Sequence, residues 1–347
     1  MSFARPRLFP VLISLLAGST GLAGSAMAEG EVNIYSYRQP FLIQPMLDRF
    51  TAETGVRTNV VFTDQGLVER LKAEGANSPA DVVLTVDISR LNELVTAKVV
   101  QPVSSPVIEA NIPAATRDPQ GRWFGLTTRA RAIFAAKDRV PAGAVTSYAD
   151  LADPRWKGRV CSRPGDHVYN IGLISAMIAH DGVDKTKAWL EGVKANLAQK
   201  PGGSDRSQVK AIKEGLCDLA LVNTYYLGAM LADPEQKAWA ESATMLFPDL
   251  SGHGTHVNVS GMAMTASAPN RDNALKLMEF LSGDEAQRLY AEANSEFPVK
   301  PDVARSPLVA SWGTFTADPI ALTEVASRAG EALKLVNEVD FNEGPGS

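Results

Sequence analysis

Residues 81–86 read Asp81-Val82-Val83-Leu84-Thr85-Val86, and after the aspartate the run is mostly apolar and β-branched, without alternation. A strand of this composition is buried on both faces, as strands are in a parallel sheet covered by helices. On either side of this run, strand-like segments alternate with segments of helical periodicity. Strands that alternate with helices predict an α/β fold in which helices flank the sheet.

The chain contains two sets of these strand–helix units. The expected strands are 32–36, 56–62, 81–86, 159–162 and 217–222, and the expected helices are 44–54, 65–74, 170–180, 185–196, 208–214, 270–281 and 284–293. Two longer β-rich segments, 126–135 and 257–265, bracket the second set. Such bracketing is what two hinge strands between two lobes would look like.

The first 28 residues have the organisation of a secretory signal peptide. Arg5 and Arg7 precede an apolar run at 8–16, and Ala26-Met27-Ala28 fits the cleavage pattern. The apolar run is too short to span a bilayer. We therefore expect cleavage near Ala28 and a soluble product in a bacterial periplasm, without direct membrane insertion.

The composition is that of an ordinary globular protein, with 45% hydrophobic and 21% charged residues. Because the predicted signal peptide holds two arginines and no acid, the mature chain would carry a net charge of about −7. This charge argues against nucleic acid and anionic membranes as partners. The two cysteines favour one disulfide in an oxidising compartment, and two buried free thiols are the alternative.

Three tyrosines carry the most specific chemical pattern. Tyr225 and Tyr226 directly follow the predicted strand at 217–222, and Tyr169 lies at the start of a predicted helix. Open α/β sheets bind ligands at the carboxyl ends of their strands. Cys161 precedes Tyr169 by eight residues, as Cys217 precedes Tyr225, so a bond between the cysteines would tie the tyrosine segments together.

Three converging phenol oxygens suit a hard, highly charged cation, and Fe(III) is the obvious one. A free phenol has a pKa of about 10, so the cation must hold the side chains as phenolates and release their protons, and binding should weaken in acid. Calcium or magnesium would need clustered carboxylates, and zinc would need Cys/His sets. The alternative is that one tyrosine of the pair lies in the core and the other in solvent. We expect Asn223 and Thr224 to cap the helix that follows.

Three tyrosinates supply half of an octahedron, and an exogenous anion held by cations could supply the rest. Arg38 follows the first predicted strand, while Arg129 and Arg131 alternate within 126–135 and would face the same way. The fork of arginine suits bidentate contact with a small oxyanion. A structural salt bridge is the alternative for each of them, most of all for Arg131.

Other motifs carry less chemistry. His253 and His256 flank a glycine-rich turn without a third ligand at zinc spacing, so we expect loop or hinge residues. The role of His167, two residues before Tyr169, stays open. The segment 202–204 lacks the Lys-Ser/Thr ending of a nucleotide loop. With no hydrolase signature in the sequence, we do not expect an enzyme.

These residues resemble those of the ferric-binding proteins, the periplasmic iron(III) receptors of ABC importers. The likeness runs over essentially the whole mature chain and is most specific at 35–40 (Tyr-Ser-Tyr-Arg-Gln-Pro), 80–87, 125–131 and 223–226 (Asn-Thr-Tyr-Tyr). It implies a two-lobed, type II-like binding-protein fold with two hinge β-strands and a ligand cleft between the lobes. We expect an N-terminal lobe at 29–129 plus 254–304 and a C-terminal lobe at 130–253 plus 305–347.

The resemblance implies that Tyr169, Tyr225 and Tyr226 ligate iron. Where many relatives have a histidine in the first strand–helix loop, this chain has Gln39 followed by Pro40. The chain thus resembles the subgroup that uses tyrosines plus a synergistic anion, often carbonate or bicarbonate.

In that subgroup, arginines that match Arg38 and Arg129 hold the anion, and Gln39 and Arg131 are further candidates for contacting it. Tyr37 is a further candidate iron ligand. The resemblance also implies the Cys161–Cys217 bridge.

The predicted function is an iron(III) receptor, a monomer, that hands its metal to an inner-membrane ABC permease. The alternative is a periplasmic binding protein for a small anionic or organic solute without metal. The fold by itself does not choose between these functions.

Overall fold

The structure, a computed structural model, describes residues 1–2 and 30–346. Residues 3–28 of the predicted signal peptide lie outside the described residues, so that segment stays a prediction. In the described part of the chain, no helix is long and apolar enough to cross a lipid bilayer. The expected α/β class is confirmed, because strands and helices alternate through both halves of the chain.

Nine strands are found among the described residues. They are β1 Glu31–Ser36, β2 Arg57–Phe62, β3 Val82–Thr85, β4 Phe124–Ala136, β5 Val160–Cys161, β6 Leu219–Asn223, β7 Ala243–Leu246, β8 Val257–Met264 and β9 Phe297–Pro298. The order of hydrogen-bonded neighbours is β2-β1-β3-β8-β4-β6-β5, and β7 and β9 pair with β4 beside this path. Strands β2, β1 and β3 are parallel, as are β5 and β6, whereas β4 and β8 run antiparallel to their neighbours.

Every helix predicted from periodicity is present. The helices are α1 Pro40–Thr54, α2 Leu67–Glu74, α3 Ile88–Thr96, α4 Pro106–Asn111, α5 Val168–Asp181, α6 Val183–Asn196, α7 Asp205–Lys213, α8 Tyr225–Ala232, α9 Lys237–Ser242, α10 Arg271–Ser282, α11 Asp284–Asn294, α12 Pro307–Ala310, α13 Leu322–Ser327 and α14 Ala329–Glu338.

Two of these helices, α1 and α7, begin three or four residues earlier than their periodicity indicates. Helix α1 begins at Pro40, because proline is favoured in the first turn, where its missing N–H would have no intrahelical partner. Helix α7 begins at Asp205, because the Ser204 side chain accepts a hydrogen bond from the backbone N–H of Ser207. In both helices a capping or first-turn residue, rather than an apolar repeat, sets the start.

Strand β3 is buried on both faces, as its sequence predicts. Val82 and Leu84 belong to the hydrophobic cluster that includes α1 and α10, whereas Val83 belongs to the cluster that includes α2 and α3. Strand β6 is covered in the same way, with Leu221 on the side of α5 and α6 and Val222 on the side of α7. Helices on both faces leave the carboxyl ends of these strands as the open edges where ligands can approach.

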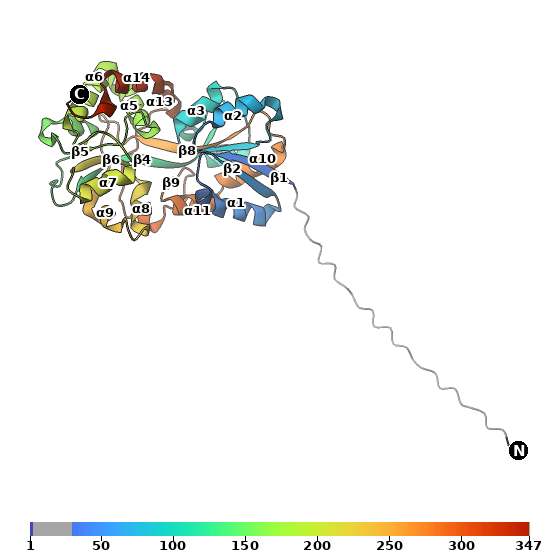
Figure 1. Cartoon of the computed structure of the whole chain (residues 1–347). Coiled ribbons are helices and arrows are strands. Elements are labelled where there is room, and N and C mark those ends of the chain that lie inside the picture. The colour runs from blue at the N-terminus through green and yellow to red at the C-terminus, as the bar shows by residue number, and fades with distance from the viewer. Residues whose placement is uncertain (3–29, 347) are drawn as a thin grey trace.

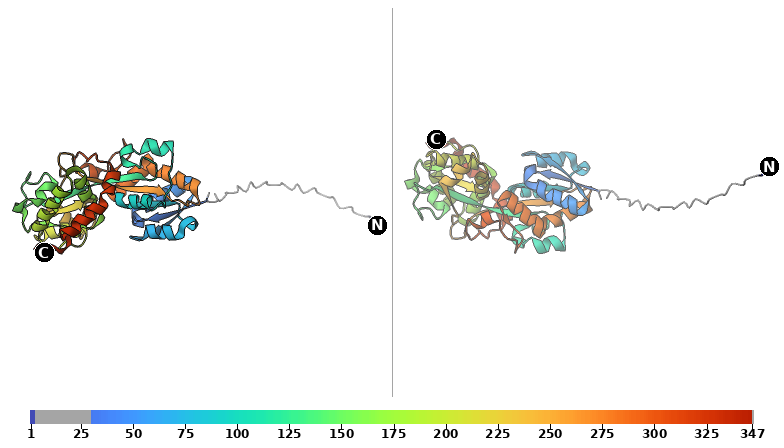
Figure 2. Two further views of the ribbon diagram at one scale, coloured as in Figure 1. Left: turned by 90° about the horizontal axis from the view of Figure 1, so that it is seen from above. Right: turned by 90° about the horizontal axis from the view of Figure 1, so that it is seen from below.

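Strand β4 joins two bodies of the molecule. Its residues 124–130 pair with β8, and its residues 131–135 pair with β6. Figure 1 shows that α1, α2, α3 and α10 lie on one side of the point where β4 changes its partner from β8 to β6. Helices α5, α6, α7 and α9 lie on the other side. The views from above and below in Figure 2 show the same separation. The predicted lobe boundaries, 29–129 plus 254–304 and 130–253 plus 305–347, stay a prediction.

Two glycines face each other where β4 crosses β8. Gly125 is the register partner of Gly261, and the register shifts between Gly125 and Thr127. A Cβ atom added at Gly261 would lie 2.7 Å from the carbonyl oxygen of Phe124 and 2.8 Å from a methyl carbon of Leu91. The backbones of the two crossing strands therefore approach too closely for any other residue at Gly261.

Replacing Gly261 with alanine should lower the free energy of unfolding by about 1–3 kcal/mol, the usual cost of forcing an extra methyl group into a packed site. The measurement is urea denaturation of the purified mature protein. Gly330→Ala is the matched control, because its Cβ meets nothing within 4 Å and it lies in α14. The control should be neutral or slightly stabilising. Equal stability of Gly261→Ala and wild type would contradict the close approach.

Candidate metal centre

Parallel strands β5 and β6 bring the three tyrosines together. Tyr169 is the second residue of α5, which follows the loop that leaves β5. Tyr225 and Tyr226 are the first two residues of α8, one residue after β6 ends. Because β5 and β6 are parallel neighbours, their carboxyl ends lie at the same edge of the sheet.

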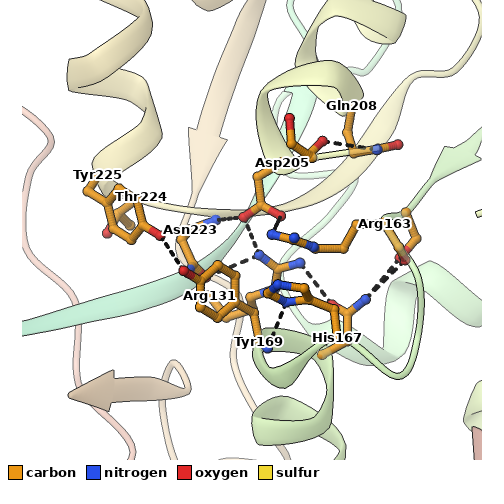
Figure 3. Close-up of polar contacts among 12 residues, drawn as sticks. Arg131, Arg163, His167, Tyr169, Asp205, Gln208, Asn223, Thr224 and Tyr225 are labelled. Carbon is orange, nitrogen blue, oxygen red and sulfur yellow. Dashed lines mark hydrogen bonds and ion pairs between the residues drawn. The ribbon is translucent and has the colours of Figure 1, made fainter. Parts of the chain in front are cut away.

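The hydroxyl groups of two of the tyrosines are in contact. The Tyr225 hydroxyl donates a hydrogen bond of 2.9 Å to the Tyr169 hydroxyl oxygen, as Figure 3 shows. The ring centroids of Tyr225 and Tyr226 are 4.3 Å apart. All three side chains line one cleft of about 700 Å³, so both members of the adjacent pair point the same way. The alternative of one core and one solvated tyrosine is therefore not what the structure contains.

The phenols do not ionise readily by themselves. Burial raises the pKa of Tyr225 well above its usual 10, and the neighbouring Tyr169 and Tyr226 add to the effect. Burial also raises the pKa of Tyr226, with further contributions from Tyr169 and Asp205. Among the described residues, no cluster of three or more His, Cys, Asp or Glu side chains could hold a metal ion. A metal in this cleft would therefore depend on phenol oxygens and would have to displace their protons itself.

The predicted disulfide between Cys161 and Cys217 is confirmed. Its two Cα atoms are 5.9 Å apart, and it joins the end of β5 to the residues that lead into β6. No free cysteine is found in the described part of the chain. The bond thus links the two segments that carry the tyrosines, at a point eight residues before Tyr169 and eight before Tyr225.

The expected caps of α8 are wrong. No side chain caps this helix at Thr224, which itself has helical backbone angles. The Thr224 hydroxyl instead accepts a hydrogen bond from the backbone N–H of Ala130, and the Asn223 side-chain oxygen accepts one from Arg131. Both side chains thus accept hydrogen bonds from residues of β4, and these bonds hold the junction between β6 and α8 against the neighbouring strand.

Arg131 is held in a buried salt bridge, the structural alternative that the sequence left open. Its Nη1 donates to a carboxylate oxygen of Asp205 at 2.5 Å and to Asn223 at 3.1 Å, while its Nη2 donates to Asn170 at 2.8 Å. Figure 3 shows the Asp205 carboxylate between Arg131 and Arg163. Both terminal nitrogens of Arg131 are engaged, and its role as an anion ligand stays only a prediction.

Arg38 and Arg129 both reach Ser260 on β8. Arg38 donates to the Ser260 hydroxyl and forms an ion pair of 3.0 Å with Glu296, which also accepts a 2.7 Å hydrogen bond from Thr127. Arg129 donates to Ser260 at 3.2 Å and is 1% exposed. Within residues 30–346 Arg129 makes no direct ion pair. The nearby buried carboxyl is Asp87, whose pKa is raised by burial while the charge of Arg129 opposes that rise.

Tyr37 and Gln39 line the same cleft from its other side. The Tyr37 hydroxyl accepts a 3.2 Å hydrogen bond from the backbone N–H of Leu67, and the Arg90 guanidinium lies 3.8 Å from its ring centroid. Gln39 is exposed and occupies the N-cap position of α1 without capping it through its side chain. Their roles as iron and anion ligands stay predictions, and the hydroxyl of Tyr37 already has a partner at the start of α2.

A profile of the bacterial extracellular solute-binding proteins matches residues 45–317. The chain belongs to this family. Iron uptake protein A1 of Synechocystis is 42% identical to this solute-binding protein over 324 residues, which cover 92% of this chain and 90% of that protein.

Solved structures of similar proteins extend the comparison. Ferric iron-binding protein A of Mannheimia haemolytica, in an open conformation, is 55% identical, with a TM-score of 0.86 and coverage of 90% of this chain and 99% of that one. A Trichodesmium protein in complex with iron and citrate ligands is 38% identical, with a TM-score of 0.86 and coverage of 90% and 100%. The predicted resemblance to ferric-binding proteins and the predicted fold are confirmed.

The histidines of this solute-binding protein do not form a metal site. His180 stacks on His253 with a 4.0 Å centroid separation and pairs with Asp318 at 2.9 Å. His167 caps α5, because its Nδ1 accepts a hydrogen bond from the backbone N–H of Tyr169, and its ring lies 4.5 Å from the Tyr169 ring. His256 is buried just before β8, and neither of its ring nitrogens has a hydrogen-bond partner.

The sequence analysis missed two carboxylates of this site. Asp205 lies 74 residues from its partner Arg131, and Glu296 lies 258 residues from Arg38. Asp205 follows Ser204 and looks like an ordinary first-turn acid of α7, while Glu296 precedes the two-residue strand β9. No sequence pattern around either carboxylate indicates its partner, because the arginine lies far away in the chain and is brought close only by folding.

His256 should make the stability of the apo protein sensitive to acid. Burial lowers its pKa to about 3, and the charges of Arg131, Arg129 and His180 act in the same direction. Between pH 6.5 and 3 the unfolded chain binds a proton that the folded chain excludes, so stability is lost as the pH falls below 6.5. The expected cost is about 1.4 kcal/mol per pH unit for this group.

The measurement is urea unfolding at pH 7.5, 6.5 and 5.5, for wild type and for His256→Leu. The variant cannot titrate at this position, so its stability should decline less steeply with acid. His253→Leu is the control, since it removes an exposed histidine and leaves the buried His256 in place. Parallel pH profiles for wild type and His256→Leu would contradict the assignment.

Proposed function

We propose that this protein captures iron(III) in the periplasm and delivers it to an ABC importer, and that it catalyses no reaction. The observation that carries the proposal is the direct contact between the Tyr169 and Tyr225 hydroxyls, with Tyr226 beside them in the same cleft. Hard, anionic oxygen donors suit a trivalent cation, and the similar proteins of Synechocystis and Mannheimia are named for iron uptake and ferric iron binding.

A synergistic anion completes the proposed site. Arg129 supplies a buried guanidinium that makes no direct ion pair among the residues that the structure describes, and Arg38 lies beside it at Ser260. A buried charge of this kind is costly unless an anion neutralises it. Carbonate or bicarbonate fits as a small planar oxyanion, and citrate, which accompanies iron in the Trichodesmium protein, offers the same carboxylate chemistry.

A second candidate function is the binding of a small anionic or organic solute without metal. The apolar part of the cleft wall, which includes Phe41, Phe62 and Leu308, favours it. In that case Arg38 and Arg129 would hold the anionic group of the solute directly. The two functions differ in whether ligand binding needs iron.

Iron(III) should give the wild-type protein a visible colour through phenolate-to-metal charge transfer. Combined Tyr225→Phe and Tyr226→Phe substitutions should abolish the colour and weaken iron binding by more than the roughly 10- to 100-fold loss typical of outer-shell partners. The measurements are the visible spectrum, elemental analysis and competition with citrate.

Tyr35→Phe is the matched control, because the Tyr35 hydroxyl donates to Glu74 and its removal should leave the colour unchanged. A wild-type protein that stays colourless and binds no iron(III) would overturn the proposed function. Stabilisation against heat by an organic anion in the absence of iron would then favour the second candidate.

The anion proposal predicts that bicarbonate or citrate raises the iron(III) affinity of the wild-type protein. Arg129→Gln should reduce this enhancement by about 10- to 100-fold, because a hydrogen bond to a charged group contributes about 1.5–3 kcal/mol. The measurement is iron titration at fixed pH with and without the anion. Arg122→Gln is the control, because it breaks the ion pair with Asp118 and neither residue lines the cleft. The same anion dependence in Arg129→Gln and wild type would contradict the role of Arg129.

A further inference from the structure

Two different links join the segments that carry Tyr169 and Tyr225. The disulfide joins them at Cys161 and Cys217, where β5 ends and before β6 begins. A second link lies at the other end of β6, next to the tyrosines themselves. It consists of polar contacts that converge on Asp205, and Figure 3 shows those with Arg131, Arg163 and Asn223.

The Asp205 carboxylate is the centre of this second link. One oxygen accepts hydrogen bonds from Arg131 at 2.5 Å and from the backbone N–H of Asn223 at 2.8 Å. The other oxygen accepts from Arg163 at 3.1 Å. Asp205 has no exposed surface and Arg131 is 2% exposed, so water does not compete for these bonds. Asp205 thus joins α7, β4, the end of β6 and the loop after β5.

Arg131 carries the link onward to Tyr169. Its planar fork reaches Asp205 and Asn223 with Nη1 and Asn170 with Nη2. Asn170 directly follows Tyr169, and its amide nitrogen donates to the carbonyl oxygens of Arg163 and Pro164. The fork is rigid, so it fixes the separation between the residue after Tyr169 and the residue two before Tyr225.

The disulfide does not fix the positions of the tyrosine hydroxyl groups in the same way. Between Cys161 and Tyr169 the chain passes through a loop. Residues 162–164 of this loop are held by the Asn170 side chain and by the ion pair of Arg163 with Asp205, both of which belong to the second link. Between Cys217 and Tyr225 lies the whole of β6. A constraint placed eight residues away restricts the unfolded chain more than it restricts the position of a side chain in the folded protein.

We propose that Asp205 is the positioning residue of the metal centre, because it sets the separation of the Tyr169 and Tyr225 hydroxyls through Arg131, Asn170 and Asn223. The proposal rests on the proposed iron(III) function and deepens it. Asp205 itself does not touch the metal. Because Asp205 forms the ion pair with Arg131, Arg129 is the arginine of β4 that makes no direct ion pair among the described residues and can hold an anion.

The chain offers a matched control in Asp218. Like Asp205, Asp218 is a buried aspartate held by two arginines, here Arg139 and Arg159. It lies directly before β6, at the end far from the tyrosines. Asp205→Asn and Asp218→Asn therefore remove the same charge from an aspartate that two arginines hold, at opposite ends of one strand, although the arginines of Asp218 are the more exposed.

The experiment compares wild type, Asp205→Asn, Asp218→Asn and the double variant Cys161→Ser/Cys217→Ser, each as full mature protein loaded with iron(III) and bicarbonate. The readouts are the iron dissociation constant against citrate, the position and intensity of the charge-transfer band at saturation, and the melting temperature without iron. A loss of folding stability lowers the melting temperature but does not shift the band of saturated protein.

Asp205→Asn should weaken iron binding by about 10- to 100-fold, as outer-shell changes do, and should shift or weaken the band. Asp218→Asn and the cysteine double variant should melt earlier and yet keep the wild-type band and affinity. A wild-type band and affinity in Asp205→Asn would overturn the proposal. So would equal losses in Asp205→Asn and Asp218→Asn, or equal losses in Asp205→Asn and the cysteine variant.

Arg131→Lys decides the question if Asp205→Asn does not fold. Lysine keeps the positive charge near Tyr169 but cannot bridge Asp205 and Asn170 as the arginine fork does. A shifted band with weakened binding would support positioning, and an unchanged band would overturn it. A wild-type protein that binds no iron would instead refute the proposed function. The wild-type measurement identifies this outcome separately from the effects of the variants.

Discussion

The metal centre depends on the burial of phenol hydroxyls against one another. The hydrogen bond from Tyr225 to Tyr169 satisfies one polar group that the cleft removes from water, while burial keeps the proton on Tyr225. A carboxylate cluster would already be anionic at neutral pH and would attract many divalent ions. Neutral phenols present little charge until a strongly polarising ion replaces their protons, so a preference of the proposed site for a trivalent cation follows from the choice of side chain.

The surrounding elements serve to hold these hydroxyls in place. Strands β5 and β6 end at the same edge, and α5 and α8 begin there without intervening regular structure. The second strand of the hinge region, β8, contributes Ser260, which contacts both Arg38 and Arg129. The proposed cation-binding and anion-binding side chains therefore come from different sides of one cleft and approach each other where β4 passes between the two bodies.

Sequence patterns predicted the parts of the fold that depend on local chemistry. The unbroken apolar run at 81–86 predicted a doubly covered strand, and the cysteine and tyrosine offsets predicted which segments meet. Helix starts were less accurate, because Pro40 and Ser204 set them rather than apolar periodicity. The caps expected at Asn223 and Thr224 were wrong, since contacts with a strand more than ninety residues earlier take both side chains. The carboxylates of Asp205 and Glu296 could not be assigned, because their partners are distant in the chain.

Strand β4 has one further consequence. Arg129 lies in the part that pairs with β8, and Arg131 lies in the part that pairs with β6, so two arginines only two residues apart are attached to different bodies. A change in the angle between the bodies would therefore move the two arginines relative to each other. Such a change would carry the Arg129 guanidinium toward or away from the tyrosines, so the width of the cleft sets how closely the proposed anion-binding and iron-binding groups approach each other.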